Sequence, residues 1–363
     1  MSTYIEEGTH YAYIIKHINN ISFNKLQVIA NKFISFLPEA LVEELYSNLH
    51  RGVDQIKNES ELYAYIASFG YMHAAKLHHA FKRISDDFNS HTQIDIIDYG
   101  CGQAIGSVCY ADYLHTNHIN QAVRSITLVE PSRRALGRAV LHVSSFFPNT
   151  KIFAINKGFD ELTESDFRRE CDVPTMHIFS NVLDLADNLY NLEHLVNLIK
   201  KCSSRENLFI CVGPYFGYPN KDLQFENLFS ILGIKPYYHK IFSKGDFIKG
   251  RDWTCQVSIG IKKCVDNLQF RNVKTARQLI KENNDSNIDI IKSPKTGKLF
   301  FTCGDIKGYI TRSVTSVIST ITIDDVVYAE ILFDGEYIPC LVLRNNRSKF
   351  PIKILGEFPG EKP

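Results

Sequence analysis

A group of small residues follows a short apolar run near residue 100. Residues 94–107 read IDIIDYGCGQAIGS, with Asp98 ending the apolar run and Gly100, Gly102 and Gly106 after it. Glycine is favoured where a backbone turns sharply or where another molecule comes close to it. An apolar strand followed by glycines and then a helix predicts a loop that binds a ligand at the start of that helix.

The spacing of the glycines disfavours two common ligands. A dinucleotide fingerprint needs its third glycine at position 105, which is Ile105. A P-loop needs Gly-Lys-Ser/Thr, which the segment lacks. A pyrophosphate ligand is therefore not expected. A bare strand–helix joint in another Rossmann-like fold stays open as an alternative.

The segment resembles motif I, D-x-G-x-G-x-G-x-G, of the class I S-adenosylmethionine-dependent methyltransferases, with Ala104 at one of the four glycine positions. The resemblance covers about residues 90–264 and implies S-adenosylmethionine as the cofactor. In that family the glycine turn lies against the methionine part, and Asp98 would favour its ammonium group directly or through water. The other cofactor contacts expected from this loop are Cys101 and Gln103.

A second acidic residue agrees with this resemblance. Glu130, in the segment LVEPS, ends the next strand, 32 residues after Asp98. The family has an acid at this place that accepts hydrogen bonds from both ribose hydroxyls, and a carboxylate suits a diol because it offers two acceptor oxygens. Pro131 beside it is included in the expected site. Alone, Glu130 would be interpreted as a solvated acid at a strand end.

Two later segments extend the expected site. After the third strand, Phe159 would pack on the adenine ring and Asp160 would accept from its amino group; an ordinary loop is the alternative. After the fourth strand, Ser180 and Asn181 would lie nearest the sulfonium. Both are also common helix-capping residues.

These motifs do not identify the methyl acceptor. The segment after the fourth strand is neither the Asp/Asn-Pro-Pro-aromatic motif nor a Pro-Cys pair. The methyl acceptor is therefore left open as an oxygen, nitrogen or carbon atom of a small molecule, a protein or an RNA. No catalytic residue is assigned. A non-catalytic binding or interaction protein with the same fold is the second hypothesis.

The surrounding elements predict an α/β fold. Strands are expected over 94–98, 125–130, 151–156, 175–181 and 207–213, alternating with helices near 104–116, 132–147 and 185–202. A helix over 225–232 precedes two further strands, 235–243 and 253–263, joined by a linker too short for a crossover helix. The sequence therefore predicts a seven-stranded, mostly parallel Rossmann-like sheet with helices on both faces.

Three regions are expected along the chain. Residues 1–90 form an N-terminal helical region, with helices over 24–37, 38–50 and 59–84, the last with a possible break at Gly70, and would act as a substrate lid. Residues 91–264 form the methyltransferase-like domain. Residues 265–363 form a linker helix (273–284) and a small all-β module of unrecognised family. Lys292, Lys295 and Lys298 beside Phe300 and Phe301 offer a protein or RNA contact there, with a solvated hairpin as the alternative.

Composition narrows the function classes. A hydrophobic fraction of 44%, a charged fraction of 22% and a net charge of +1 are ordinary for a globular protein and give no global sign of polyanion binding. No membrane helix and no secretory signal are expected. Nine scattered cysteines without a C-x-x-C pair predict reduced thiols in the cytoplasm and no metal site. The histidines at 73, 78 and 79 are interpreted as structural, and Tyr65 or Tyr71 as a residue that covers the cofactor.

Overall fold

The computed structural model describes residues 9–50, 55–167, 173–186, 189–203, 206–246 and 253–263, together with seven strands between Asp289 and Ile354. The chain divides into two compact units, Met1–Val265 and Asp266–Pro363. The N-terminal helices therefore belong to the same unit as the α/β sheet.

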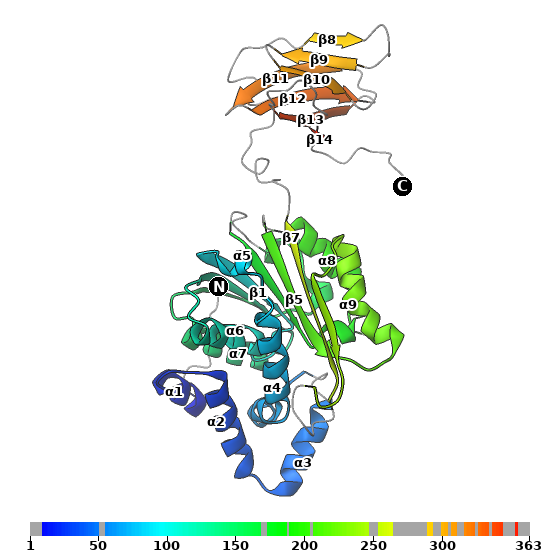
Figure 1. The fold of residues 1–363 in the computed structure, drawn as a ribbon. Coiled ribbons are helices and arrows are strands. Elements are labelled where there is room, and N and C mark those ends of the chain that lie inside the picture. The colour runs from blue at the N-terminus through cyan, green and yellow to red at the C-terminus, as the bar shows by residue number, and fades with distance from the viewer. Residues whose placement is uncertain are drawn as a thin grey trace. The chain divides into compact units, whose positions relative to one another are not determined.

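A seven-stranded sheet forms the centre of the first unit, in the order β3-β2-β1-β4-β5-β7-β6 (Figure 1). Strands β1 to β5 are parallel, and β7 is antiparallel to both β5 and β6. The predicted seven-stranded, mostly parallel sheet is confirmed. The strands are β1 (Gln93–Tyr99), β2 (Ala122–Val129), β3 (Lys151–Ile155), β4 (Thr175–Ser180), β5 (Glu206–Pro214), β6 (Tyr238–Phe242) and β7 (Cys255–Lys263).

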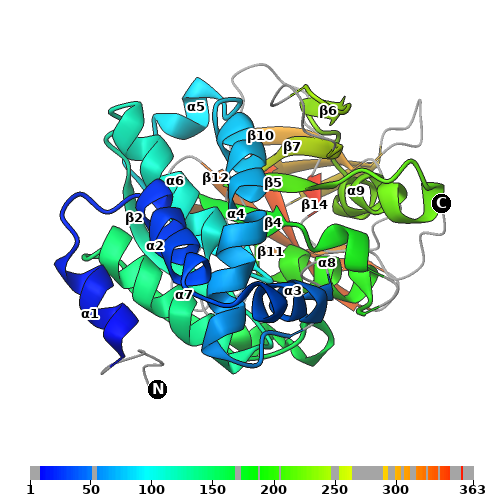
Figure 2. The same cartoon turned by 90° about the horizontal axis from the view of Figure 1, so that it is seen from below.

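Helices cover both faces of this sheet because its central strands are apolar on both sides. Consecutive residues point to opposite faces, so Ile96 belongs to one hydrophobic core and Ile97 to the other. The first core includes α6 (Ile105–Thr116) and α7 (Arg133–Phe146), and the second includes α8 (Leu192–Lys201) and α9 (Pro219–Leu232). Figure 2 shows α6 and α7 on one side of the strands and α8 and α9 on the other.

The N-terminal helices pack into the first of these cores. They are α1 (His10–His17), α2 (Phe23–Ser35), α3 (Glu39–Asn48), α4 (Glu59–Phe81) and the short α5 (Asp86–Asn89). The possible break at Gly70 is wrong, because α4 runs through it without interruption. A Cβ there would lie 3.0 Å from Cζ of Phe23, so the glycine instead allows α2 to pack closely on α4.

Two other helix starts differ clearly from the prediction. The helix expected over 225–232 begins six residues earlier, at Pro219. The helix expected over 185–202 begins only at Leu192, and a 3₁₀ turn, η4 (Leu183–Leu185), precedes it. Asn191 sets the start, since its side chain accepts a hydrogen bond from the backbone N–H of His194.

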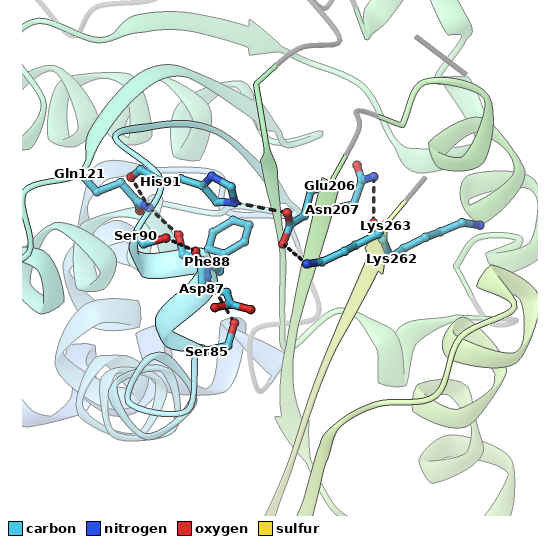
Figure 3. A network of polar contacts seen from close by, with 10 residues as sticks. All are labelled: Ser85, Asp87, Phe88, Ser90, His91, Gln121, Glu206, Asn207, Lys262 and Lys263. Carbon is cyan, nitrogen blue, oxygen red and sulfur yellow. Dashed lines mark hydrogen bonds and ion pairs between the residues drawn. The ribbon is translucent and has the colours of Figure 1, made fainter. Parts of the chain in front are cut away.

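A polar network joins the strands at their amino edge (Figure 3). Glu206, the first residue of β5, lies 3.3 Å from Nε2 of His91 and 3.9 Å from Nζ of Lys263. The side-chain amide of Gln121 donates to the carbonyls of Phe88 and His91. This edge is opposite to the carboxyl ends of the parallel strands.

The second unit contains a three-stranded antiparallel sheet, β10-β9-β8, and a four-stranded antiparallel sheet, β11-β12-β13-β14. Its strands are β8 (Asp289–Lys292), β9 (Leu299–Cys303), β10 (Ile306–Ile310), β11 (Ser316–Ile323), β12 (Val326–Phe333), β13 (Glu336–Leu343) and β14 (Lys353–Ile354). The expected linker helix at 273–284 and the side chains of the basic and aromatic cluster at 292–301 lie outside what the structure describes.

Candidate functional site

The strand order places a reversal point between β1 and β4. From β1 the chain proceeds to β2 and β3 on one side, and it then crosses to β4 and β5 on the other. Ligands of doubly wound sheets bind outside the carboxyl ends of the strands at such a point. A pocket opens there, and its lining includes seven of the twelve site residues expected from the sequence: Gly100, Gly102, Glu130, Pro131, Phe159, Ser180 and Asn181.

The loop after β1 contains two glycines in the left-handed region. Their φ angles are +59° at Gly100 and +54° at Gly102. A Cβ on Gly100 would lie 2.5 Å from Cγ1 of Val182, whereas a Cβ on Gly102 would meet no described atom within 4 Å. Gly100 is therefore needed for packing, and Gly102 presents bare backbone at the pocket wall.

Glu130 connects this loop to the end of β2. Its carboxylate accepts a hydrogen bond from the N–H of Gly102 at 3.0 Å and another from the N–H of Ser132 at 2.8 Å, one on each oxygen. Burial raises the pKa of Glu130 to about 7, although these hydrogen bonds oppose the rise. A positioned acceptor thus lies in the pocket wall beside the glycine backbone.

Asp98 lies behind the loop rather than in the pocket lining. It is 1% exposed, and one carboxylate oxygen accepts hydrogen bonds from the N–H and the hydroxyl of Ser107, at 3.0 and 2.8 Å. Gly106 packs against the same group, because a Cβ there would lie 3.0 Å from that oxygen. Burial raises the pKa of Asp98 to about 6. In this geometry Asp98 and Gly106 fix the first turn of α6.

Gln103 and Cys101 are also buried outside the pocket lining. The side-chain amide of Gln103 donates to the carbonyl of Leu62 in α4 at 2.9 Å. The Gln103 carbonyl accepts from Nδ1 of His142 at 2.9 Å, so Nε2 of that ring is the acceptor for the hydroxyl of Tyr11 at 2.7 Å. Burial lowers the pKa of His142 to about 3, which keeps the ring neutral. This chain of contacts joins α1 and α4 to the glycine loop.

The segment after β3 is divided between the pocket and a second cleft. Phe159 lines the pocket, with its ring 4.7 Å from that of Tyr190 in an edge-to-face arrangement. Asp160 lines the neighbouring cleft and accepts a hydrogen bond from the N–H of Asn191 at 2.9 Å. The structure thus separates Asp160 from Phe159.

The end of β4 contributes Ser180 and Asn181. Asn181 has φ of +59°, and its N–H donates to the carbonyl of Val212 at 2.8 Å. Its side-chain nitrogen donates to the hydroxyl of Ser180 at 3.0 Å, and its side-chain oxygen accepts from Nζ of Lys76. A left-handed non-glycine residue at a pocket wall is a feature typical of functional sites.

Helix α4 contributes Tyr65 to the pocket lining and places Lys76 against the lining residue Asn181, and sequence reasoning singled out only Tyr65. Of the two tyrosines expected to cover the cofactor, Tyr65 lines the pocket, whereas Tyr71 is 50% exposed and is not among the lining residues. Lys76 was missed. The available signal was its place between Ala74 and Leu77, two apolar residues on the buried side of the helix.

The described residues contain no group of three or more His, Cys, Asp or Glu side chains placed to hold a metal ion. Nor does this part of the chain include a helix that is long and apolar enough to cross a membrane.

Comparisons with known proteins give matches among solved structures alone. No protein-family model matches the sequence, and no curated protein matches it. An antibiotic-related methyltransferase is similar at 11% identity and a TM-score of 0.33, over 48% of this chain and 91% of that one. A 1,6-didemethyltoxoflavin N1-methyltransferase of Burkholderia thailandensis with bound S-adenosylhomocysteine has 11% identity and a TM-score of 0.38, over 62% and 88%. Plantazolicin methyltransferase in complex with SAH has 13% identity and a TM-score of 0.34, over 67% and 98%.

Proposed function

We propose that the pocket binds S-adenosylmethionine and that the protein transfers the methyl group of this cofactor to an oxygen, nitrogen or carbon acceptor. One observation carries this proposal. The bare backbone of Gly102 and the buried carboxylate of Glu130 line the same pocket at the reversal point of the sheet. These are the two elements that the motif resemblance assigns to this cofactor.

The residues present fit the cofactor. Each oxygen of Glu130 accepts one backbone N–H and keeps further acceptor capacity, so the carboxylate can bind two neighbouring hydroxyls of a ribose. The absence of a side chain on Gly102 leaves room for a close approach. Phe159 and Pro131 supply an apolar surface for a purine ring. When ionised, the carboxylates of Asp98 and Glu130 create a negative potential that suits a cationic ligand.

The chain's own part in the reaction is binding, orientation and the exclusion of water. When bound, S-adenosylmethionine supplies a methyl carbon on a sulfonium, which is already activated for transfer. Tyr65 and Ile56 line the pocket from the N-terminal region, so this region supplies part of its wall in the manner of a lid. Ser180 and Asn181 line it at the end of β4, where they can orient an acceptor.

Isothermal titration calorimetry with S-adenosylmethionine and S-adenosylhomocysteine tests the cofactor. We expect Glu130→Ala to weaken binding at least about 10- to 100-fold, because even one hydrogen bond to a charged group contributes about 1.5–3 kcal/mol. Glu206→Gln is the matched control, since Glu206 is a mostly buried glutamate at the opposite edge of the sheet. No heat with the wild-type protein, or equal affinities for wild type and Glu130→Ala, would refute the proposal.

Release of S-adenosylhomocysteine tests catalysis separately. Cell lysate, isolated RNA and a small-metabolite extract serve as sources of acceptor, with S-adenosylmethionine supplied. We expect release from one of these sources that Glu130→Ala reduces. Binding of the cofactor without release from any of them would favour the non-catalytic binding protein instead.

A further inference from the structure

Lys76 places a fully buried ammonium group next to the pocket. The residue lies in α4 with 0% exposure, and its Nζ donates to the side-chain oxygen of Asn181, 105 residues away. Among the described residues this is the one hydrogen bond of Nζ, and no carboxylate oxygen lies within 4.0 Å of it. An ammonium group has three donors, so a neutral amide alone pairs it incompletely.

The groups around Lys76 compensate its charge only in part. Asp184 after β4 and Cys255 in β7 act on it from a distance and favour the charged form. Burial has the larger effect and lowers the pKa of Lys76 to about 8, and the same environment lowers that of His73, one helical turn earlier. A buried charge is costly unless it is compensated, so a lysine at this place favours an anion nearby.

Asn181 lies between this charge and the pocket. Its side-chain oxygen faces Lys76 and its side-chain nitrogen donates to the hydroxyl of Ser180. Asn181 and Ser180 both line the pocket, and the Lys76 ammonium group lies behind Asn181, so a ligand oxygen bound to Asn181 is separated from this charge by one amide group. The left-handed backbone of Asn181 holds this arrangement at the end of β4.

We infer that Asn181 and Ser180 bind a carboxylate group of the methyl acceptor at the β4 end of the pocket, and that the buried ammonium group of Lys76 behind Asn181 balances its charge. The assignment of the ligand as a methyl acceptor rests on the proposed function, whereas the binding of a carboxylate does not. A monoanion balances a single ammonium group. A phosphate dianion would place excess negative charge within the electrostatic reach of Asp184.

The charge state of Lys76, followed by NMR in protein with ¹³C-labelled lysine side chains, tests the inference. The signal of Lys76 is the one missing from Lys76→Arg. Sodium acetate is the probe, with sodium chloride at equal ionic strength, acetamide and inorganic phosphate as comparisons. We expect acetate to raise the measured pKa of Lys76 by about 1, because an anion a few ångströms away favours the charged form, and the comparisons to leave it unchanged. No shift with acetate, or an equal shift with chloride or phosphate, overturns the inference.

A matched variant checks the geometry. Asn181→Asp keeps the size of the side chain, tolerates the left-handed backbone and supplies a carboxylate from the protein itself. It should raise the pKa of Lys76 without acetate and remove the response to acetate; a full response in this variant counts against the site.

The titrations are run with and without S-adenosylhomocysteine. Absence of S-adenosylhomocysteine binding contradicts the proposed function, while the acetate response still decides the role of Lys76.

Discussion

The substitution Gly100→Ala gives the sharpest test of the glycine loop. At φ of +59° an alanine pays the cost of the left-handed region, about 1–2 kcal/mol. Its Cβ would also lie 2.5 Å from Cγ1 of Val182, and overpacking of this kind costs about 1–3 kcal/mol. We therefore expect Gly100→Ala to lower the free energy of unfolding by about 2–5 kcal/mol, the sum of these two effects.

Gly102→Ala is the matched control for stability. Its φ is +54°, but no described atom lies within 4 Å of the added Cβ. The expected loss is only about 1–2 kcal/mol, from the backbone alone. Urea unfolding of the full chain measures both. The single tryptophan, Trp253, lies two residues before β7 in the first unit, so its fluorescence follows the unit that contains the loop.

A double variant isolates the steric contribution. Val182→Ala removes the methyl group that a Cβ on Gly100 would strike. In the pair Gly100→Ala/Val182→Ala the total loss should therefore be smaller than the sum of the single losses, by about 1–3 kcal/mol. Equal losses for Gly100→Ala and Gly102→Ala, or additive losses in the double variant, would show that the close contact does not determine the need for glycine.

Three further outcomes are expected. Gly102→Ala should weaken S-adenosylmethionine binding about tenfold or more in calorimetry, since the added methyl group enters the pocket. The affinity for S-adenosylmethionine should rise as pH increases through about 7, the raised pKa of Glu130, because the ionised carboxylate is the stronger acceptor. The stability that this group contributes is present below about 4.5 and is lost as pH rises from there to about 7. Glu130→Gln should flatten both pH profiles. The pKa of His142 is depressed from 6.5 to about 3, so its contribution to stability is present above about 6.5 and lost as pH falls toward 3; the urea midpoint should decrease less over this range in His142→Gln.

The sequence predicted the sheet and the strand ends that line the pocket, because the hydrophobic pattern shows where each strand stops. Apolar runs that alternate with helical segments fix where each parallel strand ends, and carboxyl ends of adjacent strands meet at one edge. This logic places Gly102 and Glu130 at neighbouring strand ends, and the motif resemblance assigned both to the cofactor site. The same logic places Ser180 and Asn181 at the end of β4, and the structure puts both in the pocket lining.

Side-chain directions could not be obtained in the same way. Asp98 ends a strand as expected, but the hydrogen bonds from Ser107 hold it behind the loop. Asp160 belongs to the neighbouring cleft because the start of α8 offers it an N–H. Lys76 was missed because a lysine in a helix is ordinarily solvated, and its partner lies 105 residues away. Such contacts depend on how helices pack, which the pattern of a single segment does not contain.

Helix α4 links the two ends of the pocket. Near its start, the carbonyl of Leu62 accepts a hydrogen bond from the side chain of Gln103 in the glycine loop. Fourteen residues later, or about 21 Å along the helix at 1.5 Å per residue, Lys76 contacts Asn181 at the end of β4. Tyr65 lies between them and lines the pocket. One helix thus carries three contacts, to the glycine loop, to the pocket wall and to the end of β4.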